Sequence, residues 1–144
     1  MAEELKIRVN DGTISVLLNA PAHYPQWSPD GEFILYRRSD KTGIEAITPS
    51  GGPFPINLPP LGFRNSVDNP YRFLPPGSSQ IVMLRGQYRN ENFWLADLHT
   101  GKLRQVTDLQ AGPSILSFDV ASDGRILFDR ARQNADIVMI EPSR

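Results

Sequence analysis

The chain has 144 residues, 40% of them hydrophobic and 22% charged, which suits one folded domain and is too apolar for a disordered chain. Its formal net charge of −1 gives no general attraction to nucleic acid or to an anionic membrane. Because cysteine is absent, disulfides, thiolate nucleophiles and cysteine-bound zinc are excluded.

The sequence contains no targeting or membrane-spanning pattern. The N-terminal stretch "MAEELKIRVNDG" has acidic residues and lacks the apolar core of a signal peptide. No run approaches the ~18 apolar residues that a transmembrane helix requires. As written, the chain is expected in the cytoplasm, or in the periplasm if it belongs to a larger exported or membrane-anchored protein. We expect no membrane insertion, and the compartment itself stays open.

Short apolar runs separated by glycine-containing turns follow one another along the chain. The first two runs are "LKIRV" and "TISVLLN", on either side of "NDG". A longer pattern then recurs, marked by Gly31, Gly77 and Gly124, which lie 46 and 47 residues apart. Each mark, in "WSPDG", "FLPPG" and "VASDG", lies between two apolar runs. A recurrence at this spacing predicts a repeated structural unit.

The runs that follow each mark complete the repeat. The second run of each repeat is "FILY", "IVML" or "ILF". The third run is "IEAI", "NFWLADL" or "DIVMI". The first two repeats also have a fourth run, "PFPINL" and "KLRQVTDL". Runs of this length joined by glycine turns predict antiparallel hairpins, and "SPDG" suits a type I turn. A four-stranded antiparallel unit repeated every ~46 residues is typical of a β-propeller blade.

The residues around the first mark resemble a known repeat. "YPQWSPDGEFILYRR" followed by "GIEAITPSGG" is similar to the repeat of TolB-like β-propellers, also described as WD40-like PD40 repeats. The third copy has Ala121-Ser122 in place of Ser-Pro, the second has Pro76 in place of the aspartate, and the Trp-Asp dipeptide of WD repeats is absent. Two later stretches, "NFWLADLHTGKLRQVTD" and "SFDVASDGRILFDRARQNADIVMIE", look like the C-terminal ends of propellers appended to bacterial Ser/Thr kinases or transcriptional regulators.

We therefore expect an all-β fold of four-stranded antiparallel β-propeller blades, forming a partial propeller of about three blades over residues 1–144. Residues 1–20 would be the last two strands of a blade, 21–60 and 61–112 one blade each, and 113–144 a three-stranded final blade. Closed propellers typically have four to eight blades. The chain would then be the C-terminal part of a longer propeller, or a homodimer that closes a six-bladed propeller.

The residue types that carry catalysis or bind metals lack the necessary spacing. His23 and His99 have no second ligand at metal-binding distance in the sequence, and no serine lies in Gly-x-Ser-x-Gly. Asp30 and Asp123 occupy equivalent turns, where an aspartate is expected to bond its own backbone. We predict no catalytic residue, no metal and no cofactor, so the chain is not expected to be an enzyme. The aromatic residues at strand positions are expected in the core between blades: Trp27, Tyr36, Phe73, Trp94, Phe118 and Phe128.

The lengths of the connections suggest a binding face. Connections after the first and third runs are tight, whereas those after the second and fourth are longer, for example "RGQYRNEN". In an up-and-down blade the longer connections emerge on one face, and binding tends to occur on such loops. The candidate partner-binding residues on this loop face are Arg38, Arg64, Arg85, Tyr88, Arg89, Arg130 and Arg132. The alternative is that nearby acids neutralise these arginines, or that the arginines pair with neighbouring blades.

Together these patterns predict a non-catalytic protein- or peptide-binding or scaffolding module. The resemblance implies that it belongs to a larger sensory or assembly protein. Two alternatives remain open at this point. One is the accessory propeller of a prolyl-oligopeptidase-like hydrolase, whose catalytic domain would lie outside this chain, and the other is a propeller that binds a small ligand.

Overall fold

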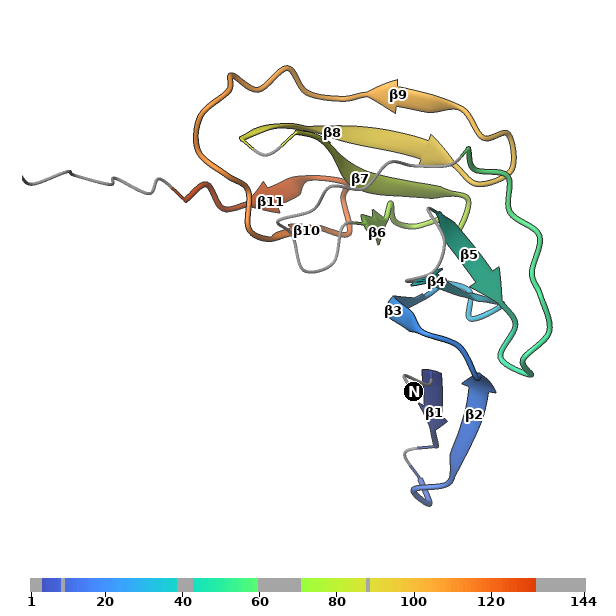
Figure 1. Cartoon of the computed structure of the whole chain (residues 1–144). Coiled ribbons are helices and arrows are strands. Elements are labelled where there is room, and N and C mark those ends of the chain that lie inside the picture. Colours follow the sequence, from blue (N-terminus) through green and yellow to red (C-terminus); the bar gives the residue numbers. More distant parts are fainter. Residues whose placement is uncertain (1–3, 9, 39–42, 60–70, 88, 132–144) are drawn as a thin grey trace, which may run out of the picture.

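The computed structural model describes residues 4–8, 10–38, 43–59, 71–87 and 89–131, and the regular elements in these ranges are all β-strands (Figure 1). The strands are β1 (Glu4–Ile7), β2 (Ile14–Leu18), β3 (Ala22–Trp27), β4 (Ile34–Arg38), β5 (Ile44–Ile47), β6 (Tyr71–Phe73), β7 (Gln80–Gln87), β8 (Asn90–Asp97), β9 (Leu103–Gln105), β10 (Phe118–Val120) and β11 (Ile126–Phe128). In these ranges no helix has the length and hydropathy needed to cross a bilayer.

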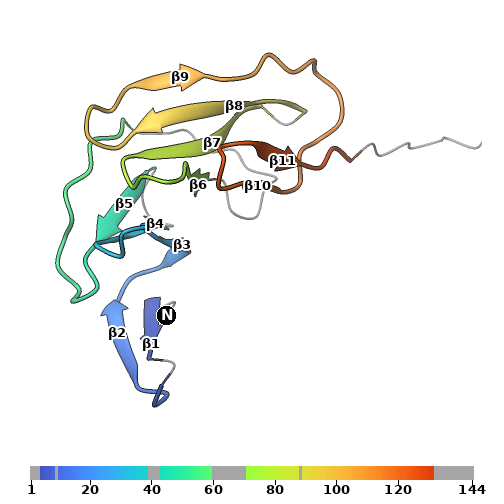
Figure 2. The same ribbon diagram turned by 180° about the vertical axis from the view of Figure 1, so that it is seen from behind.

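The strands form four antiparallel sheets, each built from strands that are consecutive in the chain. The first sheet is β1–β2, the second β3–β4–β5, the third β6–β7–β8–β9 and the fourth β10–β11. Figures 1 and 2 show the four sheets following one another in chain order along an arc. The predicted all-β class and the predicted antiparallel hairpins are therefore confirmed for the described residues.

The Ser-Pro-Asp-Gly turn between β3 and β4 is closed by its own side chains. Gly31 N donates to Ser28 O at 2.9 Å, and Gly31 adopts a φ of 76°, which favours glycine. The buried Ser28 Oγ accepts from Phe33 N at 3.0 Å and donates to Asp30 Oδ1 at 2.6 Å. Asp30 Oδ1 also accepts from Glu32 N at 3.0 Å, so the carboxylate is held in the turn.

The equivalent turn between β10 and β11 repeats this arrangement. Gly124 N donates to Ala121 O at 2.9 Å, and Gly124 has a φ of 85°. Asp123 Oδ1 accepts from Arg125 N at 3.1 Å. The backbone role predicted for Asp30 and Asp123 is confirmed at both turns.

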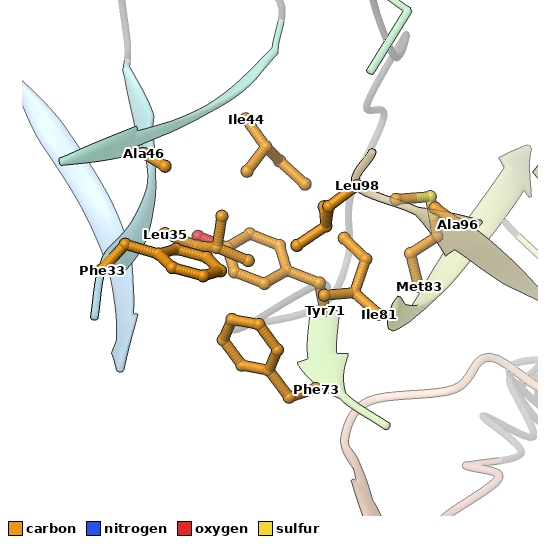
Figure 3. Close-up of a cluster of buried hydrophobic side chains, with 10 residues drawn as sticks. All are labelled: Phe33, Leu35, Ile44, Ala46, Tyr71, Phe73, Ile81, Met83, Ala96 and Leu98. Carbon is orange, nitrogen blue, oxygen red and sulfur yellow. The ribbon is translucent and has the colours of Figure 1, made fainter. Parts of the chain in front are cut away.

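Neighbouring sheets pack face to face, because alternate residues of each strand point to opposite faces. Figure 3 shows the largest core cluster, between the second and third sheets. Its buried members are Phe33, Leu35, Ile44 and Ala46 on one side and Tyr71, Phe73, Ile81, Met83, Ala96 and Leu98 on the other. The Phe33 ring contributes an edge contact with Phe73, with ring centroids 5.8 Å apart.

The opposite face of the third sheet packs against the fourth sheet. Val82, Leu84 and Phe93 lie there with Ile115 and Phe118. A third cluster joins the first sheet to the second, where Leu17 and Leu18 pack against Ala22, Ile34, Tyr36 and Ile47. The third sheet is thus covered on both faces, and each sheet packs on its neighbours in the chain.

The first strands of the second, third and fourth sheets are also joined by polar contacts. The Tyr71 hydroxyl of β6 donates to Tyr24 O of β3 at 2.5 Å, and Gln26 Nε2 of β3 donates to Tyr71 O at 2.6 Å. On the other side of β6, Arg72 Nε lies 3.6 Å from Asp119 Oδ1 of β10. These contacts place β3, β6 and β10 side by side.

The connection after β5 departs from the sequence prediction, because residues 53–58 do not form the expected fourth strand. Phe54 N donates to Ala46 O of β5 at 3.0 Å. Asn57 N then donates to Leu98 O of the third sheet at 2.7 Å. The segment therefore starts along the edge of β5 and crosses to the next sheet.

Two prolines explain this departure. Pro53 and Pro55 fix φ near −65°, away from the strand values near −120° to −140°, so the ladder along β5 is not continued. The apolar pattern that suggested a strand is still used in packing. Phe54, Ile56 and Leu58 are partly buried against the core cluster between the second and third sheets.

The connection between β7 and β8 is shorter than predicted. The sequence suggested a long loop, "RGQYRNEN", whereas the pairing of Gly86 with Glu91 and of Gln87 with Asn90 extends both strands. Polar residues lengthen a hairpin through backbone pairing, which the apolar pattern does not reveal. Gly86 has a φ of 137°, and a Cβ there would contact the Asn90 carbonyl oxygen and lie 2.9 Å from Glu91 Cα.

One aromatic prediction is wrong. Trp27 was expected in the core, but half of its surface is exposed. A bulge between His23 and Gln26, with Tyr24 at a φ of 60°, shifts the alternation of β3 before it reaches Trp27. The other five are buried or partly buried in the clusters as expected: Tyr36, Phe73, Trp94, Phe118 and Phe128.

Candidate functional site

Four of the seven residues predicted on the loop face lie in the described part of the chain: Arg38, Arg85, Arg89 and Arg130. Arg64, Tyr88 and Arg132 lie outside the described residues. Arg38 ends β4, and its charge partly offsets the effects that raise the pKa of Tyr36 to about 12. Those effects are burial of the Tyr36 phenol first and then its hydrogen bond to Glu45, which is 2.9 Å long.

Arg85, Arg89 and Arg130 each contribute to local structure. The Arg85 guanidinium lies 4.9 Å from the centroid of the Trp94 ring, a cation–π contact on the face that packs against the second sheet. Arg89 adopts a left-handed φ of 66°. Arg130 Nη2 donates to Gln110 O at 2.9 Å. Arg85 and Arg130 thus have structural contacts, and a binding role for the loop face remains a prediction.

The loop-face arginines of the third and fourth sheets are nevertheless brought to one end of the molecule. Arg89 O accepts from Gly112 N at 2.9 Å, and Arg130 bonds the nearby Gln110 carbonyl. The segment between β9 and β10 therefore lies between the two arginines.

A groove of about 570 Å³ lies at the other end of the third sheet, beside the tight turn between β8 and β9. It is lined by Gln80, Leu95, Asp97, Thr100, Lys102, Leu103 and Arg104. Gln80 pairs with Asp97 and Leu95 pairs with Arg104, so these four residues share one face of the sheet. That face also packs against the fourth sheet, because Leu95 contacts the Phe93 cluster.

The charges around the groove are unbalanced. Asp97 Oδ1 accepts from Thr100 N at 2.8 Å and from His99 N at 2.9 Å, and these bonds lower the pKa of Asp97. Its carboxylate is therefore engaged in the turn. Within the described residues, the Lys102 ammonium and the Arg104 guanidinium have no ion-pair partner. The groove combines two cations with Leu95, whereas the Leu103 side chain packs on the opposite face of the sheet.

Sequence reasoning missed this groove. The tight turn "HTG" was interpreted only as a connection, and the lining residues come from three strands. The alternation in "KLRQ" places Lys102 and Arg104 two residues apart, which is a weak indication of a shared basic surface.

Groups of side chains suited to a metal do not occur in the described ranges. No cluster of three or more histidine, aspartate or glutamate residues is found there. His23 lies on β3 and His99 lies in the turn after β8, and both are exposed. The described aspartates with lowered pKa values instead accept hydrogen bonds from backbone N–H groups in turns or in the segment before β10.

Asp129 is the most highly bonded of these aspartates. Its carboxylate accepts from Leu116 N at 2.8 Å, Ser117 N at 2.9 Å and Ser117 Oγ at 2.8 Å. The backbone bonds from Ser117 and Leu116 lower the pKa of Asp129 most. The carboxylate thus connects the segment before β10 to the residue after β11.

Asp129→Asn is expected to lower the thermal unfolding midpoint at pH 7 and to have a progressively smaller effect as the pH falls below about 4. A carboxylate with a depressed folded pKa contributes stability above its unfolded pKa, near 3.9, and loses that contribution as pH falls through the folded pKa. Unfolding followed by circular dichroism from pH 7 to pH 2 measures this. Asp108→Asn, at an exposed position, serves as the control with no change. A deficit in Asp129→Asn that does not shrink as the pH falls would contradict the assignment.

Comparison with known proteins does not assign the chain to a family. No protein-family model matches the chain, and a search of curated proteins finds no match. A function for the chain therefore has to be argued from its own residues and structure.

Proposed function

We propose that the chain is a non-catalytic interaction module, a partial TolB-like β-propeller that binds an extended acidic segment of a partner protein. The propeller assignment is supported by the repeat spacing and by antiparallel sheets that pack face to face in chain order. It is further supported by the contacts that join the first strands β3, β6 and β10. Such a module would belong to a larger sensory or assembly protein.

Four of the described aspartates, which are possible acids or bases, have structural partners. The Asp30, Asp123 and Asp129 carboxylates accept hydrogen bonds from nearby backbone N–H groups, and Asp97 does the same in the turn beside the groove. A general acid or base needs a proton-transfer position open to a substrate. These contacts favour binding over catalysis.

The groove beside β9 is the observation on which the binding proposal rests. Lys102 and Arg104 line the groove together with Leu95, which suits a peptide that combines acidic and apolar residues. β9 is at the edge of the third sheet, so its outer backbone groups can pair with an added strand. The partner segment would therefore bind as an extended strand along β9, with its acidic side chains toward the two cations.

A peptide-display selection on the immobilised chain tests this function. We expect enrichment of acidic–apolar peptides, and a fluorescein-labelled selected peptide should bind in an anisotropy titration. The double variant Lys102→Glu/Arg104→Glu should weaken its binding at least about tenfold, because each cation is replaced by a repelling charge. Added salt should weaken binding to the unmodified chain.

Arg8→Glu/Arg125→Glu is the matched control, since it changes the net charge equally at exposed positions on the first and fourth sheets. This control should retain full affinity. Equal losses of peptide affinity in both double variants would indicate non-specific electrostatic attraction and would contradict the groove as the binding site. If Arg130→Glu weakens peptide binding while the groove variant does not, the binding site lies on the loop face instead.

A further inference from the structure

Large apolar side chains are exposed on both end sheets of the stack. On the first sheet, Ile14 is 60% exposed and Val16 is 55% exposed. On the fourth sheet, Leu127 is 79% exposed, and Leu116, just before β10, is 47% exposed. Exposed apolar side chains that lie close together mark an interaction site more often than single ones do.

The alternation of each strand fixes the direction in which these side chains point. Val16 pairs with Leu5 and Leu18 pairs with Glu4, across an irregularity in the register of β1 and β2. Because adjacent residues of β1 point to opposite faces, Ile14 and Val16 lie on the face opposite Leu18, which packs on the second sheet, so they point away from the stack. Leu127 alternates with Ile126 and Phe128, which pack toward the third sheet, so it points away at the other end. Ile14 and Val16 at one end and Leu127 at the other therefore lie on the outermost faces of the described sheets.

The two outermost faces are of opposite kinds. Each sheet has a leading face, toward the preceding sheet, and a trailing face, toward the following one. The three contacts within the chain all join a trailing face to the leading face of the next sheet. Ile14 and Val16 lie on the leading face of the first sheet, and Leu127 lies on the trailing face of the fourth. Each chain thus presents one face of each kind.

We propose that a second copy of this chain covers these faces, with the leading face of the first sheet of one copy packed on the trailing face of the fourth sheet of the other. This contact continues across two chains the face-to-face packing seen three times within one chain. It is a head-to-tail contact, and two copies related by a two-fold axis would make it twice. It does not depend on the groove or on a peptide partner.

The area of the two faces determines how strongly two copies are expected to associate. A two-stranded sheet offers less than the roughly 800 Å² per partner of a standard stable interface. One contact is therefore weak, whereas two contacts made together in a closed pair reinforce each other. Dimerisation should depend on concentration, and light scattering across a dilution series should show the mass doubling.

The absence of cysteine makes a directional cross-linking test straightforward. Val16→Cys and Leu127→Cys are prepared separately, mixed, and treated with a short bismaleimide. We expect a cross-linked pair in the mixture and at least a fivefold lower yield from either variant alone. Glu32→Cys, at an exposed turn of the second sheet, should link to neither. Val16→Asp should raise the dimer dissociation constant at least tenfold while leaving the circular dichroism spectrum unchanged.

Two results would overturn the proposal. One is a monomer at every concentration. The other is Val16→Cys linking to itself as efficiently as to Leu127→Cys, since that would mean like faces meet. Neither result bears on peptide binding to the groove, which is measured separately by anisotropy.

Discussion

Replacing Phe93 with alanine should lower the free energy of unfolding by about 4 kcal/mol. Phe93 is fully buried at the centre of the contact between the third and fourth sheets. Its ring makes edge contacts with Phe118 of β10 and Phe128 of β11, each with centroids 5.1 Å apart. Alanine would remove both contacts and leave a cavity between two sheets that cannot fully collapse.

Urea unfolding followed by circular dichroism measures this loss. Phe93→Leu keeps most of the buried volume and should cost about 1–2 kcal/mol. Val106→Ala, at an exposed position beyond β9, should change stability by less than about 0.5 kcal/mol. A cost below about 1 kcal/mol for Phe93→Ala would show that this ring does not hold the fourth sheet in place.

Gly86→Ala should destabilise the chain by about 3 kcal/mol, a large effect for the addition of one methyl group. The φ of 137° at Gly86 is a conformation that residues with a Cβ rarely adopt. The added Cβ would also contact the Asn90 carbonyl oxygen and lie 2.9 Å from Glu91 Cα. Both obstacles are backbone atoms of the paired strand, so neither can move without separating β7 from β8.

The variant Gly12→Ala distinguishes the cost of backbone strain from the cost of a steric clash with the added Cβ. Gly12 also has a positive φ, 71°, but a Cβ there would meet nothing within 4 Å. This variant should therefore cost only the conformational strain, about 1 kcal/mol. Chemical denaturation of both variants under the same conditions gives the comparison. If the two variants lose equal stability, the close approach at Gly86 is relieved by a small backbone shift.

Much of the secondary structure could be predicted because its causes are local. The strands Ile44–Ile47 and Ile126–Phe128 have the predicted bounds. Each follows a glycine turn or a short polar connection and consists largely of β-forming residues. The turns at Gly31 and Gly124 were also predictable, since their hydrogen bonds join residues only a few positions apart.

The predictions from the sequence fail where the structure depends on non-local contacts or on a local change in the backbone. The bulge at Tyr24 reverses the face that Trp27 presents, and Pro25, which lies inside the bulge, is only a weak sign of it in the sequence. The groove depends on Gln80 lying beside Asp97 and on Leu95 lying beside Arg104, which requires the strand register. Register is a property of the folded sheet, so a search for motifs along the chain does not find such a site.

The prolines after β5 have a consequence for how the protein avoids aggregation. Along an extended segment, successive backbone N–H groups point to opposite edges. Phe54 directs its N–H to Ala46, so the nitrogens of Pro53 and Pro55 point outward, and proline nitrogen has no hydrogen to donate. The open side of the second sheet therefore offers a poor template for an incoming strand. Uncontrolled edge-to-edge polymerisation is discouraged there.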